Sequence, residues 1–101
     1  MVRRHGAMKT LFLLMAQYDG QAIIPLDRVC QDYFSHLSPD MFQRKALSGA
    51  LKIPIVRMEQ SQKSAKGVHL EDLATYLDTQ RLEAIRERDQ LSGGRRVGRD
   101  H

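Results

Sequence analysis

The sequence predicts a small, mainly helical α+β domain with a short β hairpin and an extended C-terminal helix. Two short amphipathic segments, residues 26–34 and 39–48, are separated by only four residues, which is typical of two helices joined by a tight turn. A β-branched segment, 52–59, and an apolar return at 68–70 follow directly and predict a hairpin. With 101 residues, the chain is long enough for one such domain but too short for two independent cores.

The first elements are predicted from apolar spacing and turn residues. Residues 8–18 are expected to form a helix whose core-facing residues recur every three to four positions. These residues are Leu11, Leu14, Met15 and Tyr18. Asp19 and Gly20 end this helix, and the β-branched segment 22–25 is expected to be briefly extended. Residues 1–7, which precede the apolar pattern, are expected to form a flexible extension.

The segment 39–48 has the strongest helix boundaries in the chain. Ser38 is a good N-cap, and Pro39 suits the first helical position because its missing N–H costs nothing there. Gly49 can adopt the left-handed conformation that ends such a helix. The residues expected to point into the core are Phe42 and Ala46 of this helix and Val29, Cys30, Tyr33 and Phe34 of the preceding one.

The C-terminal half is predicted to contain the hairpin, one long helix and a tail. Residues 60–67 are small, polar and basic, as expected for an exposed turn between the two strands. Residues 71–91 begin with two acids and have an apolar stripe, so they are expected to form a helix. Residues 92–101 are expected to be a flexible basic tail. Two helices followed by a hairpin are the layout of a winged helix-turn-helix DNA-binding domain.

Charge is unevenly distributed along the chain. The formal net charge is +4 and the sequence pI is about 9.6, so anionic partners are favoured. The basic residues of the segment 41–66 are Arg44, Lys45, Lys52, Arg57, Lys63 and Lys66, against Glu59 alone. Residues 67–90 contain three arginines and six acids. Positive charge therefore coincides with the second short helix and the hairpin, the two elements that a winged helix uses on DNA.

No catalytic, metal or cofactor site is predicted. The histidines, His5, His36, His69 and His101, are scattered and form no metal-ligand pair. Cys30 is the only cysteine, and it is expected to be a buried, unreactive thiol. Because one cysteine cannot form an intramolecular disulfide, the protein is expected in a reducing cytoplasm. The apolar run 11–16 is too short for a secretory signal or a membrane span.

The residues from Met8 to Arg81 closely resemble the pyocin activator protein (PrtN) family. The resemblance rests on "LFLLMAQYDG", "IIPL", "IPIVR", "SQK" and "KGVHLEDLATYLD", which occur in the same order. It implies a bacterial or prophage transcriptional activator, which binds DNA upstream of phage-tail-like bacteriocin genes and acts in the response to DNA damage. The layout is more loosely similar to small phage regulators of the AlpA and excisionase type.

The helix 39–48 is the predicted recognition helix. In the major groove, Gln43 can pair with adenine and Arg44 with guanine, whereas the lysines and arginines of the hairpin are expected to touch phosphates. The full set of predicted DNA contacts is Ser38, Asp40, Gln43, Arg44, Lys45, Ser48, Lys52, Arg57, Gln62, Lys63 and Lys66.

Besides double-stranded DNA, two partners are expected. One recognition helix covers only a few base pairs, so several copies are expected to bind together, through 77–91 or as neighbours on repeated sites. An activator must also recruit RNA polymerase, and the acidic segment 71–89 is a candidate surface. Two alternatives stay open, since fold does not decide function: an excisionase-type architectural protein that bends DNA, and a winged-helix adaptor that binds proteins without binding DNA.

Overall fold

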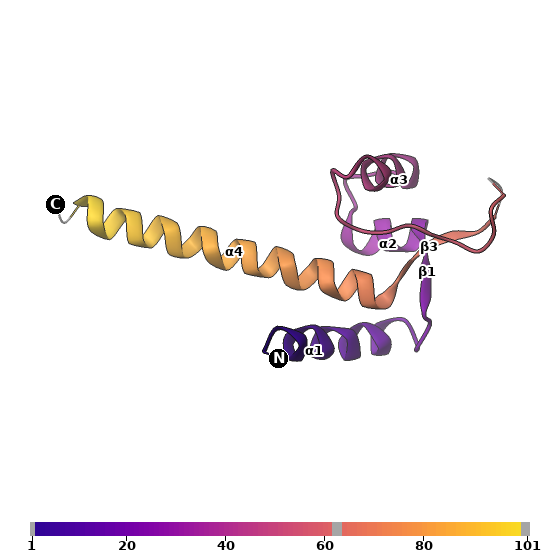
Figure 1. Ribbon diagram of the computed structural model, residues 1–101, viewed down its shortest axis with the longest axis horizontal. Helices are drawn as coiled ribbons and strands as arrows, with labels where there is room; N and C mark the ends of the chain where they lie inside the picture. Colours follow the sequence, from indigo (N-terminus) through magenta and orange to yellow (C-terminus); the bar gives the residue numbers. More distant parts are fainter. Residues whose placement is uncertain (1, 62–63, 100–101) are drawn as a thin grey trace.

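The protein is a mainly helical α+β domain with a small antiparallel sheet and a long C-terminal helix (Figure 1). The computed structural model describes residues 2–61 and 64–99, with side chains described for 9–61 and 64–92. The elements in chain order are α1 (Val2–Gln17), β1 (Ile23–Pro25), α2 (Leu26–Tyr33), α3 (Pro39–Ser48), β2 (Val56–Arg57), β3 (Lys66–His69) and α4 (Leu70–Arg99). The predicted α+β class, with a small sheet and an extended C-terminal helix, is confirmed.

The sheet has three strands in the order β1-β3-β2, all antiparallel, rather than the predicted two. β1 pairs along β3, with Ile24 opposite Val68, so the segment expected to be merely extended is an edge strand. β2 is shorter than the predicted 52–59 because Pro54 has no N–H to donate to a ladder and the Ile53 side chain turns into the core.

Gly67 lies where the three strands meet. It is paired with Pro25 on one side and with Val56 on the other. A Cβ atom at this position would collide with the backbone oxygen of Ile24 and with Cγ2 of Ile23. The absence of a side chain therefore allows β1 to approach the central strand closely enough to pair.

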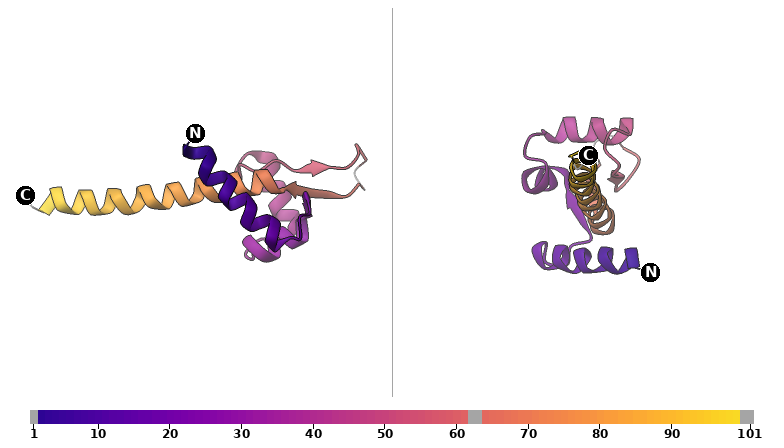
Figure 2. Two further views of the ribbon diagram at one scale, coloured as in Figure 1. Left: turned by 90° about the horizontal axis from the view of Figure 1, so that it is seen from below. Right: turned by 90° about the vertical axis from the view of Figure 1, so that its left-hand side faces the viewer.

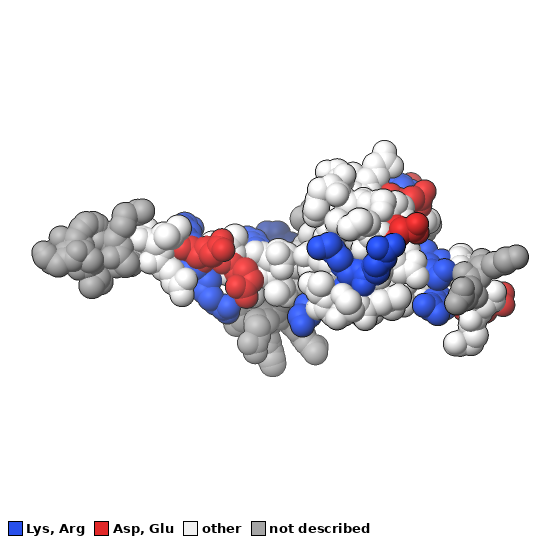
Figure 3. All heavy atoms as spheres, turned by 90° about the horizontal axis from the view of Figure 1, so that it is seen from above, with Lys and Arg blue, Asp and Glu red and all other residues white. Residues whose placement is uncertain are grey.

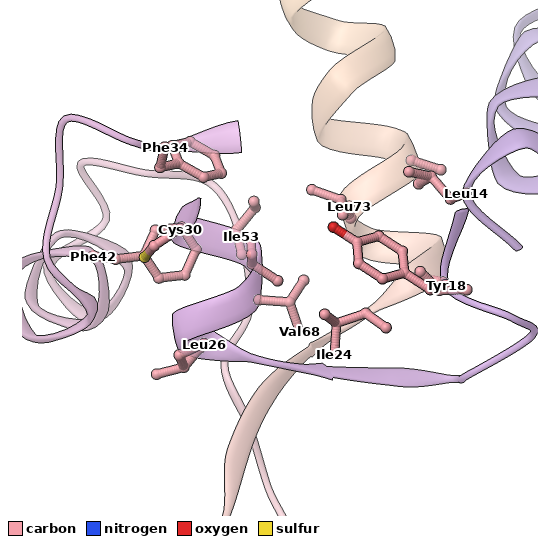
Figure 4. Close-up of a cluster of buried hydrophobic side chains, with 13 residues drawn as sticks. Leu14, Tyr18, Ile24, Leu26, Cys30, Phe34, Phe42, Ile53, Val68 and Leu73 are labelled. Carbon is pink, nitrogen blue, oxygen red and sulfur yellow. The ribbon is translucent and has the colours of Figure 1, made fainter. Parts of the chain in front are cut away.

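The core draws on every helix and on the sheet (Figure 4). Leu14 and Tyr18 of α1 pack near Leu73 of α4, while Ile24 and Val68 of the sheet connect them to the α2–α3 side. An aromatic cluster closes that side: the Phe34 ring centroid lies 4.9 Å from that of Phe42 and 5.6 Å from that of Tyr76. The remaining core residues are Leu26, Val29, Cys30, Ile53, Leu70 and Ala74.

Cys30 is buried, as predicted, whereas the three methionines whose side chains the structure describes are exposed. Burial and the nearby carboxylate of Asp27 raise the pKa of the Cys30 thiol, which keeps it protonated. Met15, Met41 and Met58 are exposed. The expectation that Met15 belongs to the apolar stripe of the first helix is wrong, because the face that contacts α4 and the sheet is narrower and consists of Leu11, Leu14 and Tyr18.

Polar contacts fix α1 against α4 and α2. The Thr10 hydroxyl donates to Oδ1 of Asp78 at 2.6 Å, which ties α1 to α4. The Tyr18 hydroxyl donates to Oδ2 of Asp32 at 2.6 Å, and the Arg28 guanidinium lies 5.0 Å from the centroid of the Tyr18 ring. The C-terminal end of α1 is therefore held on α2 by three kinds of contact to one tyrosine: burial, a hydrogen bond and a cation–π contact.

Both terminal helices are longer than predicted. α1 begins at Val2 instead of residue 8, and α4 continues to Arg99 instead of ending at 91, so both helices extend into the segments 1–7 and 92–101. No proline lies in either helix to stop it, and each added residue extends the ladder by one hydrogen bond. α4 accounts for the elongated outline of 60 × 27 × 22 Å (Figure 1).

Phe42→Ala is expected to lower the free energy of unfolding by about 3–5 kcal/mol, since it removes a fully buried ring from the aromatic cluster. Phe12 is the matched control: 66% of it is exposed, and Phe12→Ala is expected to change stability by about 0.5 kcal/mol or less. Urea unfolding followed by circular dichroism measures both, and similar losses for the two variants would contradict the packing described above.

Stability is expected to fall at alkaline pH because of Tyr18. Burial, followed by the hydrogen bond to Asp32, raises the pKa of Tyr18 well above its ordinary value of 10.0. Above about pH 10 the unfolded chain releases this proton while the folded chain retains it, so the free energy of unfolding decreases as pH rises. In urea titrations at pH 8 to 11, Tyr18→Phe should reduce this decrease without abolishing it, because burial also raises the pKa of Tyr33. If the free energy of unfolding of Tyr18→Phe falls with pH as steeply as that of the wild type, the assignment of this pH dependence to Tyr18 is contradicted.

Candidate nucleic-acid interface

α3 is held rigidly at both ends by local hydrogen bonds. The Ser38 hydroxyl accepts from the backbone N–H of Met41 at 3.2 Å, and Pro39 occupies the first turn, as predicted. At the other end Gly49 adopts a left-handed conformation, with φ of 89°, and its N–H donates to the carbonyl of Ala46 at 3.2 Å. These caps satisfy backbone groups that the ends of a ten-residue helix would otherwise leave unpaired.

One face of α3 is buried and the opposite face is exposed. Phe42 is fully buried and Ala46 is half-buried, so this side rests on the core. Asp40, Arg44 and Ser48 follow at four-residue intervals along the exposed side. The structure therefore brings these three predicted contacts together in one row.

The remaining predicted contacts on α3 lie at the edges of this row or are engaged locally. Gln43 is half-buried at one edge, and Lys45 is exposed at the other. The Ser48 hydroxyl donates to the carbonyl of Lys45 at 3.0 Å and accepts from the N–H of Ala50 at 3.3 Å. Ser38 and Ser48 therefore both have a structural role at the helix ends, which the sequence prediction recognised only for Ser38.

The hairpin adds basic side chains beside α3. Lys52 and Arg57 are exposed, and Arg57 lies opposite Lys66 in the β2–β3 register. Side chains of directly opposed residues extend from the same face of a sheet, so the two basic side chains lie together on one face of the hairpin. Gln62 and Lys63, predicted at the tip of the hairpin, lie outside the described residues.

Basic side chains gather on the face of the molecule that Figure 3 shows. Lysines and arginines are grouped over the compact part of the domain, with acids next to them, further basic groups lie toward the hairpin, and acids and bases are intermixed along α4. On α4 the guanidinium groups of Arg86 and Arg88 pair with Glu83 at 3.1 Å and with Asp89 at 3.0 Å. The charge segregation seen along the sequence thus becomes a spatial one.

In residues 9–61 and 64–92, no three His, Cys, Asp or Glu side chains are grouped so that they could hold a metal ion. Among the helices that the structure describes, none combines the length and apolarity that crossing a bilayer requires.

Exposed apolar residues are the functional candidates that the sequence prediction missed. Leu47 is exposed on α3, and Phe12 and Leu13 are exposed on α1. Figure 2 shows α4 end-on between α3 and α1, so the two helices lie on opposite sides of α4. A helical-wheel projection of 39–48 places Leu47 one turn beyond Arg44 on the exposed side, and this signal was available in the sequence.

The predicted self-association segment, 77–91, contains two exposed leucines. Leu82 and Leu91 are nine residues apart, which places them on opposite sides of α4. Ile85, which is half-buried, lies three residues after Leu82 and therefore neighbours it on the helix surface.

The comparison with protein families matches residues 10–84 to the family described as "Pyocin activator protein PrtN". The match covers α1 from Thr10 onward, α2, α3, all three strands and the first half of α4. Comparisons with curated proteins and with solved structures found no significant match.

The capping contact of α3 can be tested with a pair of serines. Ser38→Ala removes the acceptor for the Met41 N–H and is expected to lower the free energy of unfolding by about 1 kcal/mol. Ser35→Ala, an exposed position in the connection before α3, is the control and should change stability little. Equal losses for the two variants in urea unfolding would contradict the capping role.

Proposed function

Because the chain belongs to the pyocin activator protein family, we propose that it activates pyocin genes by binding duplex DNA upstream of them. In this proposal α3 enters the major groove and the β2–β3 hairpin lies along the phosphate backbone, as in a winged helix-turn-helix. Duplex DNA is the proposed partner because its phosphates complement the basic side chains. The proposal requires no cofactor.

The exposed row on α3 is the observation that carries this proposal. The major groove of B-DNA admits one α-helix, and α3 has a rigid, capped, exposed face with Arg44 at its centre. A guanidinium can donate two hydrogen bonds to O6 and N7 of guanine, and the amide of Gln43 can pair with adenine. Arg44 is therefore assigned the main part in base recognition, with Gln43 and Asp40 beside it.

The hairpin and the loop before it supply sequence-independent affinity. Lys52 and Arg57 are exposed, and the Arg57–Lys66 pair concentrates positive charge at one point of the sheet edge. Phosphate contacts of this kind position the protein on the duplex without specifying sequence. They also make binding weaken steeply as the salt concentration rises, because bound counterions are released from the DNA.

A role in binding proteins is supported by a different observation, the exposed apolar residues of α1. Phe12, Leu13 and Met15 are exposed on the side of α4 away from α3, and exposed apolar patches often mark protein contacts. This surface remains accessible while α3 is in a groove. We therefore propose it, in place of the acidic part of α4, as the surface that contacts the transcription machinery.

The DNA-binding proposal predicts a specific loss for Arg44→Ala. Fluorescence-anisotropy titrations would compare a duplex from upstream of a pyocin gene cluster with a scrambled duplex, at several salt concentrations. Arg44→Ala is expected to weaken binding to the upstream duplex by about 1–3 kcal/mol and to leave binding to the scrambled duplex nearly unchanged.

Arg81→Ala is the charge-matched control, since Arg81 is exposed on α4 outside the proposed interface, and it should bind like the wild type. Equal affinity of the wild type for both duplexes would favour an architectural protein of the excisionase type. Absence of binding at low salt would refute the DNA proposal and favour the adaptor. A reporter gene fused to the upstream region separates activation from DNA bending, because only an activator raises its output.

A further inference from the structure

Leu47 is an apolar side chain in the middle of a polar surface. It is 60% exposed, and it lies three residues after Arg44 and four after Gln43, so it neighbours both on the helix surface. It lies five residues after Phe42, which places it on the side of α3 away from the core. Packing within the described chain therefore does not account for a leucine here.

We infer that Leu47 contacts the C5-methyl group of a thymine in the major groove and selects thymine beside the base pair that Arg44 contacts. This inference rests on the proposed function and adds a specificity-determining residue to it. Leu47 provides an apolar contact beside the row of Asp40, Arg44 and Ser48, whose side chains end in hydrogen-bonding groups.

The chemistry of the major groove supports this assignment. Thymine is the one unmodified base that presents an apolar group there, its C5-methyl, whereas the other positions present hydrogen-bond donors and acceptors. Arg44, Gln43 and Asp40 can distinguish donors from acceptors but gain nothing from a methyl group. A leucine gains free energy when its own surface and the methyl group leave water together.

The other exposed apolar residue of α3 does not share this position. Met41 lies six residues before Leu47, about 120° away around the helix, next to Lys45 at the opposite edge of the exposed row. In the proposed orientation this edge faces a phosphate backbone. Leu47 is therefore the apolar side chain of α3 that lies beside Arg44.

The test uses uracil in place of thymine, which removes the methyl group and leaves every hydrogen-bonding atom in place. The probe is the duplex that the protein selects from a random duplex library, and each thymine is replaced singly. For the wild type, uracil at one or two positions should weaken binding about fourfold, the effect of removing one buried methyl group. Leu47→Ala should bind the thymine and uracil duplexes equally.

Leu91→Ala is the matched control, because Leu91 is 65% exposed on α4; it should retain the preference for thymine. The inference is overturned if the wild type does not distinguish uracil from thymine at any position, or if Leu47→Ala still does. If Arg44→Ala weakens binding to the preferred duplex but no uracil substitution changes the affinity of the wild type, only the thymine contact is overturned. Failure to select any duplex overturns the proposed function together with this inference.

Discussion

The structure depends on the central position of β3. This strand pairs with β1 on one side and with β2 on the other, and it runs directly into α4 at Leu70. It therefore joins the N-terminal part of the chain, the hairpin and the long helix through one ladder. The constraint is strict at Gly67, where any side chain would collide with β1, and Val68, which follows it, is fully buried in the core.

The orientation of α3 follows from a second constraint, the aromatic cluster. Phe42 packs against Phe34, which in turn contacts Tyr76 of α4. Once Phe42 is buried, the periodicity of the helix places Asp40, Arg44 and Ser48 in water. The caps at Ser38 and Gly49 prevent the helix from sliding or fraying at either end. Core packing and local backbone chemistry thus present the proposed recognition surface together.

The two opposite sides of the molecule differ in chemistry. The α3 side is polar and carries many basic groups with acids beside them, and the cross-strand pair Arg57 and Lys66 lies on the hairpin. Phe12 and Leu13 are exposed on α1, and α4 lies between α1 and α3. Under the proposed function, the α3 side would bind DNA and the α1 side would bind another protein.

Much of the fold was predictable because it depends on local sequence. Ser38, Pro39 and Gly49 define α3 by capping and backbone preferences that act within a few residues, and Phe42 and Cys30 are buried where helical periodicity indicates. The row containing Arg44 follows from the same periodicity.

The sequence by itself therefore determined the class of the fold, the helix α3 and the residues on its outer face. The tertiary structure alone decided that residues 23–25 form a strand, because a strand's partner is set by contacts between distant segments such as Ile24 and Val68. It also decided that Met15 is exposed while Leu14 is buried, because the width of an apolar stripe depends on what packs against it. The local pattern records which residues can be buried; the packing of α1 on α4 and the sheet selects which of them are.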